Sequence, residues 1–235
     1  MDLFVEADPR VCNVSVERRM PCDRVVIANW EQRHSACLPE DLRNFYASTD
    51  GFQLTWNYKY SADEILPVGT IKVNCLNDLC MSPTLKDILD SSQSSHYSGQ
   101  RPVLNTKSKV FELDSCRNIG KICLIYTGGM WSVWLAARDG AWGWLTDSFT
   151  HYFRMALVHL GLPGWQATFA NLPLIPWAEQ LFLLLAPHLL EKTETDASAL
   201  IPAAEASLNH IDPNIFKTSS KHHKNHGHTA RSPNH

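Results

Sequence analysis

Between residues 30 and 58 the order of apolar and polar positions predicts a helix, a turn and a strand in succession. The sequence Leu-Pro-Glu-Asp at 38–41 is typical of a helix start, because proline is tolerated in the first turn and acidic residues favour the positive end of the helix dipole. The apolar residues that follow recur at intervals of three and four and form one stripe along the helix. They are Leu42, Phe45 and Tyr46.

A chain reversal and a strand complete this unit. Asp50-Gly51 predicts the reversal, since glycine adopts the positive φ that tight turns require. From Phe52 to Tyr58 apolar and polar residues alternate strictly, which is typical of a half-buried strand. We expect Trp30 and Trp56 to lie in the core, because a large indole is more often a packing residue than a ligand platform.

Shorter patterns predict the elements on either side of this unit. A strand is expected around residues 11–17, and a helix is expected from Cys22 with Asp23 in its first turn. Residues 65–74 are rich in β-branched side chains and predict one or two strands, interrupted at Pro67 and Gly69. A short helix is expected near residues 85–89, within an otherwise irregular stretch.

Apolar runs in the second half of the chain predict further strands joined by short turns. Thr127-Gly128-Gly129 and Asp139-Gly140 are the turn sequences. Four tryptophans lie between residues 131 and 144, and we expect the helix that follows to cover them. The predicted strands span 110–114, 121–126, 131–135 and 141–145.

The most regular apolar pattern in the chain predicts a core helix that begins after Thr146 or Asp147, either of which is a competent N-cap. Apolar residues recur with helical spacing from 149 to 160. Gly161 is expected to end this helix, and a last helix is predicted from Pro176 to Ala186.

These elements together predict an α+β fold, in which helices pack on one side of an antiparallel or mixed sheet of about five or six strands. The strands form two runs separated by helices, which argues against a regular βαβ repeat. We expect a partly irregular segment at 1–21, the α+β domain at 22–190, and a mostly disordered tail at 191–235 that is first acidic and then basic and rich in histidine.

Composition narrows the class of protein. The chain has 235 residues, of which 44% are hydrophobic and 19% are charged, and its net charge is −3. This is a globular composition, and the net charge argues against a nucleic-acid-binding protein. The longest apolar run, at 181–186, is far shorter than the roughly 20 residues that a membrane span needs.

Cysteine and histidine offer little chemistry by their spacing. The seven cysteines are scattered and no signal peptide precedes them, which favours reduced thiols in the cytosol. Cys75 and Cys80, like Cys116 and Cys123, are too far apart for a zinc-binding pair, so we expect buried free thiols. No nucleotide-binding loop with a lysine is present, because Gly128-Gly129 is expected in a hairpin.

Histidines leave two alternatives open. A cysteine nucleophile paired with His34, in an expected polar turn, or with His151, on a helix flank, is possible, although solvated or hydrogen-bonded histidines are the favoured interpretation. The histidines of the tail could bind a transition metal weakly, but a solvated low-complexity segment is favoured. We therefore expect no cofactor and no catalytic residue.

The central unit resembles the start of the SUKH superfamily, which includes regulators of fungal cell walls and bacterial immunity proteins. The residues that carry this resemblance are Trp30, Glu31, Leu38, Pro39, Glu40, Phe45, Tyr46, Gly51, Phe52 and Trp56. Further segments are similar to the family of subunit 2 of the tubulin polyglutamylase complex, in the same order along the chain. They are residues 111–116 (FELDSC), 120–126 (GKICLIY), 145–154 (LTDSFTHYFR) and 159–166 (HLGLPGWQ).

The resemblance implies a non-catalytic scaffold or targeting subunit of a complex that adds glutamates to tubulin tails. Its implied partners are a tubulin-tyrosine-ligase-like catalytic subunit, other subunits of the complex, and tubulin or microtubules, with no nucleic acid and no membrane. The implied location is the cytoplasm and cytoskeleton, including centriolar satellites and basal bodies. The alternative is a SUKH-type regulatory module that binds proteins unrelated to tubulin.

Two departures from the family pattern concern the ends of the chain. The family usually opens with another helix, and we expect this sequence to begin after it. The family's basic tail, rich in serine and glycine, is replaced here by a histidine-rich one. The cations of this tail could hold acidic tubulin tails by salt-sensitive attraction, although a charged tail that only aids solubility is the simpler interpretation. These cations are Lys217, Lys221, Lys224 and Arg231.

Overall fold

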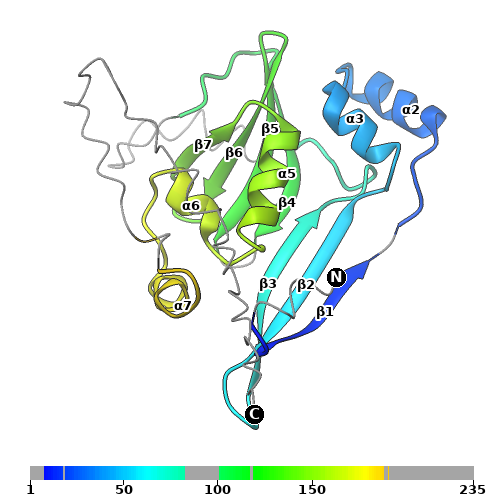
Figure 1. Cartoon of the computed structure of the whole chain (residues 1–235). Helices are drawn as coiled ribbons and strands as arrows, with labels where there is room; N and C mark the ends of the chain where they lie inside the picture. The colour runs from blue at the N-terminus through cyan, green and yellow to red at the C-terminus, as the bar shows by residue number, and fades with distance from the viewer. Residues whose placement is uncertain (1–7, 18, 83–100, 117–118, 188–189, 191–235) are drawn as a thin grey trace, which may run out of the picture. The chain divides into compact units, whose positions relative to one another are not determined.

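The computed structural model describes residues 8–17, 19–82, 101–116, 119–187 and 190. The described chain forms two antiparallel sheets and a set of helices, which confirms the predicted α+β class (Figure 1). The strands are β1 Val11–Glu17, β2 Phe52–Lys59, β3 Ile65–Val73, β4 Lys109–Cys116, β5 Gly120–Thr127, β6 Met130–Ala137 and β7 Trp142–Thr146. The helices are α2 Arg24–His34, α3 Glu40–Tyr46, α5 Phe149–Val158, α6 Trp165–Phe169 and α7 Pro176–Leu185.

The strands do not form the single sheet of five or six strands that the sequence predicted. One sheet has three strands in the order β1-β2-β3, and the other has four in the order β4-β5-β6-β7. The two sheets meet where β3 passes β4. There the Asn74 backbone N–H donates to the Leu113 carbonyl at 2.9 Å, and the Asn74 side-chain amide donates to the Glu112 carbonyl at 3.2 Å.

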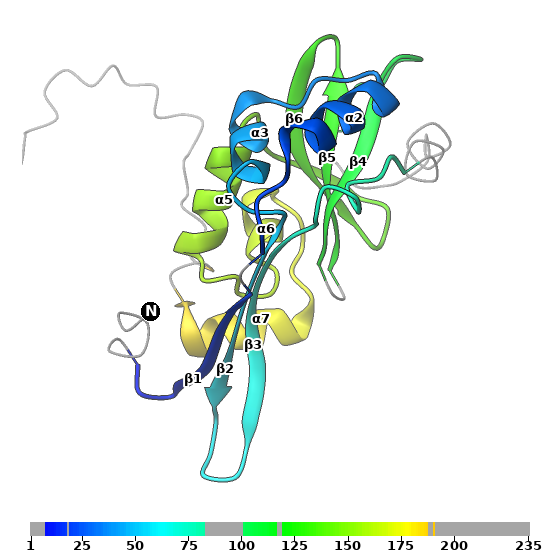
Figure 2. The same ribbon diagram turned by 90° about the vertical axis from the view of Figure 1, so that its right-hand side faces the viewer.

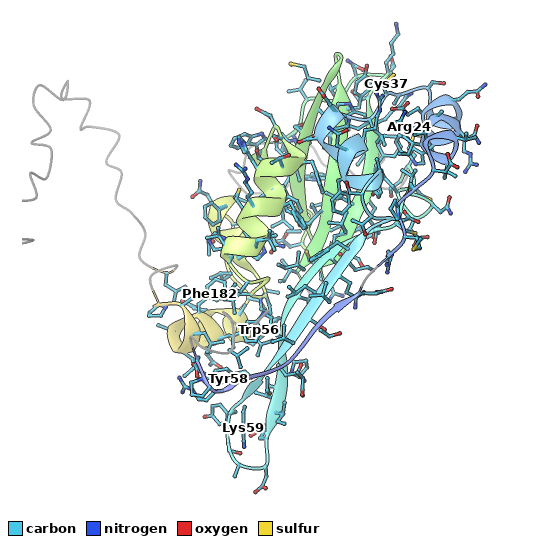
Figure 3. All side chains as sticks on the ribbon, turned by 45° about the vertical axis from the view of Figure 1, so that its right-hand side comes forward. Arg24, Cys37, Trp56, Tyr58, Lys59 and Phe182 are labelled. Carbon is cyan, nitrogen blue, oxygen red and sulfur yellow. The ribbon has the colours of Figure 1, made fainter. Side chains whose placement is uncertain are left out.

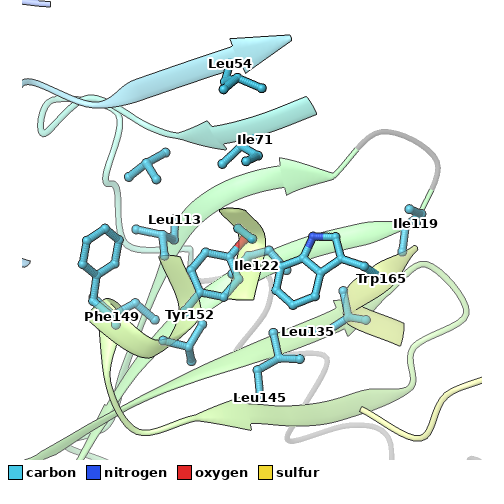
Figure 4. Packing of buried hydrophobic residues seen from close by; sticks show 14 of the residues in the cluster. Leu54, Ile71, Leu113, Ile119, Ile122, Leu135, Leu145, Phe149, Tyr152 and Trp165 are labelled. Carbon is cyan, nitrogen blue, oxygen red and sulfur yellow. The ribbon is translucent and has the colours of Figure 1, made fainter. Parts of the chain in front are cut away.

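One hydrophobic core unites both sheets. Leu54 and Ile71 of the three-stranded sheet belong to the same buried cluster as Leu135, Tyr152 and Trp165 on the other side of the core (Figure 4). The helices α5 and α6 cover one face of the four-stranded sheet (Figures 1 and 2). Because small sheets need a packed face to be stable, neither sheet is expected to fold without this shared core.

The predicted alternation along β2 is confirmed. Leu54, Trp56 and Tyr58 are buried, and the residues between them are only partly so. Phe182 of α7 belongs to the same cluster, and Figure 3 shows it on the side of β2 that carries Trp56 and Tyr58. Gly51 has φ +86° in the predicted reversal, and a Cβ there would lie 2.8 Å from the Val73 carbonyl oxygen.

Of the one or two strands predicted at 65–74, the structure has one, Ile65–Val73, which runs through Pro67 and Gly69 without the predicted interruption. The register shifts between Trp56 and Asn57, whose partners are Gly69 and Pro67. This irregularity leaves Val68 without a register partner and allows proline within the strand. Gly69 is required for a different reason, because the Trp56 indole lies directly against it.

The boundaries of two helices differ from the predictions. Asp23 is the N-cap of α2 rather than a first-turn residue, and its carboxylate accepts from the Val25 backbone N–H. Ser148, and not Thr146 or Asp147, is the N-cap of α5, because Thr146 remains paired with Val133 in the sheet. The ends of α5 and α7 also come earlier than predicted, and the five-residue helix α6 was not predicted.

The tryptophans of the second half lie on different sides of the four-stranded sheet, so the expectation that α5 covers all of them is wrong. Trp134 and Trp142 belong to a second buried cluster, separate from the core cluster that contains α5. Trp144 is exposed and donates to Asp147. Trp131 is partly buried against the main core. Because side chains alternate along β6, Trp134 lies on the other face of the sheet from Val133 and Leu135, which face the main core.

Replacement of Gly69 by alanine should severely destabilise the protein. A Cβ at this position would lie 1.6 Å from Trp56 Nε1, which also donates a hydrogen bond to the Leu160 carbonyl at 2.7 Å. Displacing this indole should cost more than about 3 kcal/mol of unfolding free energy. Gly128→Ala is the matched control, since nothing lies within 4 Å of its Cβ position and only the φ of +61° opposes the change. Equal losses in urea unfolding would contradict this account.

Candidate protein-interaction surfaces

The residues that carry the SUKH resemblance lie in α2, α3, β2 and the loops between them, where most of them serve the packing. Trp30, Leu38, Tyr46 and Trp56 are buried. The Trp30 indole N–H donates to the Leu79 carbonyl at 3.0 Å, and the Tyr46 hydroxyl donates to the Asn74 carbonyl at 2.9 Å. Each bond satisfies a buried polar group and ties the unit to the chain beyond β3.

Glu31 closes the loop between α2 and α3. Its Oε1 accepts the Leu38 backbone N–H at 2.8 Å and the Arg43 Nη2 at 2.5 Å. The hydrogen bond to this carboxylate raises the pKa of Arg43 above its usual value. Pro39 takes the N-cap position of α3, and Glu40 lies in its first turn. Glu31 therefore acts here as a structural residue.

Aromatic side chains join α3 to α5. The Phe45 ring lies 4.9 Å from Phe149 and 5.7 Å from Phe153, and Phe52 meets Phe153 edge to face at 5.2 Å. A polar contact in the same place was not predicted. Asp41 Oδ2 accepts the Thr150 backbone N–H at 2.8 Å and the Ser148 hydroxyl at 3.0 Å, which helps to cap α5 across more than a hundred residues.

A groove of about 580 Å³ lies between the α2–α3 loop and the hairpin of β5 and β6. Tyr126 and Trp131 line the hairpin side, with ring centroids 4.9 Å apart. The Trp131 indole N–H donates to the Cys37 carbonyl at 3.0 Å, and the Lys109 ammonium donates to the Ser35 carbonyl at 2.7 Å. The loop side is lined by Glu31, Gln32, Ser35, Ala36, Cys37, Leu38 and Pro39. These bonds fix both walls, so the groove is preformed.

Helix α7 presents a second candidate surface, because it is apolar on its outer side as well as its inner side. Ala178 and Phe182 are buried against the core. Trp177 is 43% exposed, Leu183 63% and Leu184 50%, and Glu179 is the only charged residue of the helix. Large apolar side chains that stay exposed on a helix whose other side is already packed are typical of a contact with another protein.

The described thiols are not all buried as expected, and only some of them lie in surroundings that oppose reactivity. Of the two pairs considered for zinc, only Cys123 is buried, Cys80 is exposed, and Cys75 and Cys116 are intermediate. Burial raises the pKa of Cys123 to about 12, which keeps its thiol protonated. Within the described ranges, no group of three or more histidine, cysteine or acidic side chains could hold a metal ion.

The sequence predicted His34 in a polar turn, and this prediction is wrong. His34 occupies the last turn of α2, and its ring packs 4.5 Å from Trp30 and 5.3 Å from Phe111. Burial lowers its pKa, and the charges of Arg33 and Lys109 act in the same direction, so the ring is neutral at pH 7. His151 is exposed on α5, as expected.

Other expected features fall on parts of the chain that the structure does not describe. The tail cations Lys217, Lys221, Lys224 and Arg231, the histidines of the tail and the short helix near 85–89 lie outside the described residues. In the part of the chain that is described, no helix is long and apolar enough to cross a membrane.

The geometry is that of an α+β protein whose conspicuous surfaces suit protein contacts. Over 238 aligned residues the chain is 35% identical to a protein named tubulin polyglutamylase complex subunit 2 from Rattus norvegicus, covering 93% of this chain and 78% of the relative. Proteins of the same name from Mus musculus and Homo sapiens are 34% and 33% identical over similar shares. No protein-family model and no solved structure matches the chain. The chain belongs to the family of tubulin polyglutamylase complex subunit 2.

Replacement of Glu31 by alanine should open the α2–α3 loop. The change leaves the Leu38 N–H without its acceptor and Arg43 without its partner, which should cost about 2 kcal/mol of unfolding free energy. Glu40→Ala is the control, because its first-turn position contributes only about 0.5 kcal/mol through the helix dipole. The measurement is equilibrium urea unfolding followed by tryptophan fluorescence. If both variants lose the same amount, Glu31 is not the residue that closes the loop.

Proposed function

We propose that this chain is a non-catalytic scaffold or targeting subunit of a tubulin polyglutamylase complex. In this role it supports the addition of glutamate chains to tubulin tails by a separate tubulin-tyrosine-ligase-like subunit. The observation that carries the proposal is the identity of 33–35% to relatives named as subunit 2 of that complex, over 93% of this chain.

Two features of the described residues support a role without catalysis. The polar groups of the shared motif are engaged in packing, since Glu31 bonds to Leu38 and Arg43, and Trp30 and Tyr46 bond to backbone carbonyls. Burial raises the pKa of the Cys22 and Cys123 thiols to about 12, far from what a nucleophile needs.

The partners are proposed to be the catalytic subunit, the other subunits of the complex, and tubulin or microtubules. The outer face of α7 supports such contacts, because buried apolar anchors, tryptophan above all, dominate the binding energy of protein interfaces. The proposed location follows from these partners and is the cytoplasm, with microtubules, centriolar satellites and basal bodies.

Introducing charge on α7 tests the proposed partnership. We expect Leu183→Glu with Leu184→Glu to reduce co-precipitation of the catalytic subunit from ciliated cells by at least about tenfold, since each buried charge at an interface costs more than about 1 kcal/mol. Folding should be unaffected, because both side chains are exposed. Val158→Glu is the matched control, since Val158 is 75% exposed on a different helix.

Each outcome of this experiment separates the candidate functions. Recovery of the catalytic subunit with the unmodified chain, but not with the α7 variant, supports the scaffold role and this interface. Recovery with both excludes α7 as the contact and leaves the groove beside Trp131 to be mapped. If neither the catalytic subunit nor tubulin is recovered with the unmodified chain, a SUKH-type regulatory module unrelated to tubulin becomes the better interpretation.

The tail cations are proposed to hold acidic tubulin tails near the complex. Lys217, Lys221, Lys224 and Arg231 lie in a stretch, 213–235, whose sequence contains neither aspartate nor glutamate. Deletion of 213–235 should therefore weaken binding to an acidic tail peptide at low salt and leave the thermal unfolding of the chain unchanged. The check is fluorescence anisotropy at about 20 mM and about 300 mM salt, where the Debye length falls several-fold. Unchanged binding at low salt would leave only the solubility role.

A further inference from the structure

Asp114 places a carboxyl group inside the core, close to the contact between the two sheets. Its exposed fraction is 6%, and its Oδ1 has no hydrogen-bond partner. Its Oδ2 accepts a weak bond from the Cys116 thiol, at 3.6 Å, and the Ser115 backbone also bonds to the carboxyl group. A buried carboxylate is normally paired or well hydrogen-bonded, so this arrangement needs an explanation.

The groups around this carboxyl come from β3, β4, α5 and α6. Cys116, on the same strand, also accepts from the Gln166 side chain of α6, at 3.4 Å. Tyr152 of α5 is buried next to these groups and interacts with Gln166. The charged neighbours are Lys72 of β3, which favours the ionised carboxylate, and Glu112 of β4, which opposes it.

Burial is the largest influence on this group and raises the pKa of Asp114 to about 6. The Cys116 thiol, the Lys72 ammonium and the Ser115 backbone act in the opposite direction, but they do not compensate. The neutral acid therefore suits the site as it is built, and the ionised form does not. Ionisation would favour any movement that brings the carboxylate closer to Lys72 or to water.

The nearest contact that such a movement would disturb is the junction between the sheets. Leu113 and Glu112, the residues directly before Asp114, accept the two hydrogen bonds from Asn74 that join the end of β3 to β4. Lys72 lies two residues before Asn74. The Asp114 carboxyl group and the two acceptor carbonyls therefore lie within residues 112–114 of β4. Lys72 and Asn74, which face them, lie within residues 72–74 at the end of β3.

We propose that Asp114 is a proton-linked switch for the junction between the two sheets, closed when its carboxyl group is neutral and loosened when it is ionised. Because the folded-state pKa lies above the ordinary value of 3.8, the stabilising effect of the neutral form is complete below about pH 4. It is lost as the pH rises through about 6. The loosened junction would open the Asn74 hydrogen bonds to β4 locally, while the shared core stays packed.

Hydrogen exchange of the Asn74 backbone amide reports on this junction directly. In the full chain, we expect its protection factor, corrected for the intrinsic pH dependence of exchange, to fall by about tenfold between pH 5 and pH 7.5. In Asp114→Asn the protection should stay flat across this range. Asp63→Asn, at an exposed position, is the control and should behave like the unmodified chain. The same pH dependence in Asp114→Asn would overturn the proposal.

A second variant separates the switch from a merely structural role. Lys72→Met removes the cation that favours ionisation, so protection should continue to fall up to a higher pH than in the unmodified chain. This variant keeps the buried carboxyl group and tests the proposal even if Asp114→Asn does not fold. Protection that levels off at the same pH or a lower one would overturn it.

Discussion

Hydrogen bonds from tryptophan side chains to backbone carbonyls tie distant parts of this chain together around the core that the two sheets share. Trp56 reaches Leu160, Trp131 reaches Cys37 and Trp30 reaches Leu79, across sequence separations of 104, 94 and 49 residues. The indoles of Trp30 and Trp56 are buried, and each pairs its N–H with a backbone carbonyl. A sheet of three strands and one of four each need a packed apolar face to be stable, so the fold depends on these contacts.

The packing role of the motif residues bears on function. The side chains that make the family resemblance recognisable are largely committed to packing, and they position surfaces rather than reacting groups. Glu31 and Trp131 fix the two walls of a groove from opposite sides, and the inner face of α7 anchors a helix whose outer face is still apolar. Exposed surfaces of this kind agree with membership of a family of complex subunits.

Periodicity along the chain predicted the local structure well and the long-range arrangement poorly. The alternation in β2 and the helical spacing in α5 come from neighbouring residues, so both were visible in the sequence. Which strands pair is decided by contacts far apart along the chain, and the single predicted sheet proved to be two. His34 was misplaced for the same reason, since its burial depends on Phe111.

The polar residues of the core were the hardest to foresee. Asp114 follows the apolar Leu113 in a strand, where an acidic residue is ordinarily expected to face water. The register shifts between Glu112 and Asp114, and this irregularity changes which side chains of β4 face the core. The pattern of residue types does not reveal such a shift. Asp41 was likewise assigned to its own helix start, whereas its side chain also bonds to the first turn of α5.

The most direct test of the central claim, that this chain assists catalysis without performing it, is an in vitro glutamylation assay on purified tubulin. The purified full chain is measured alone, the catalytic subunit alone, and the two together, with glutamate incorporation as the readout. We expect no incorporation by this chain alone and more incorporation by the pair than by the catalytic subunit alone. Incorporation by the isolated chain, or no effect of adding it to the catalytic subunit, would contradict the account.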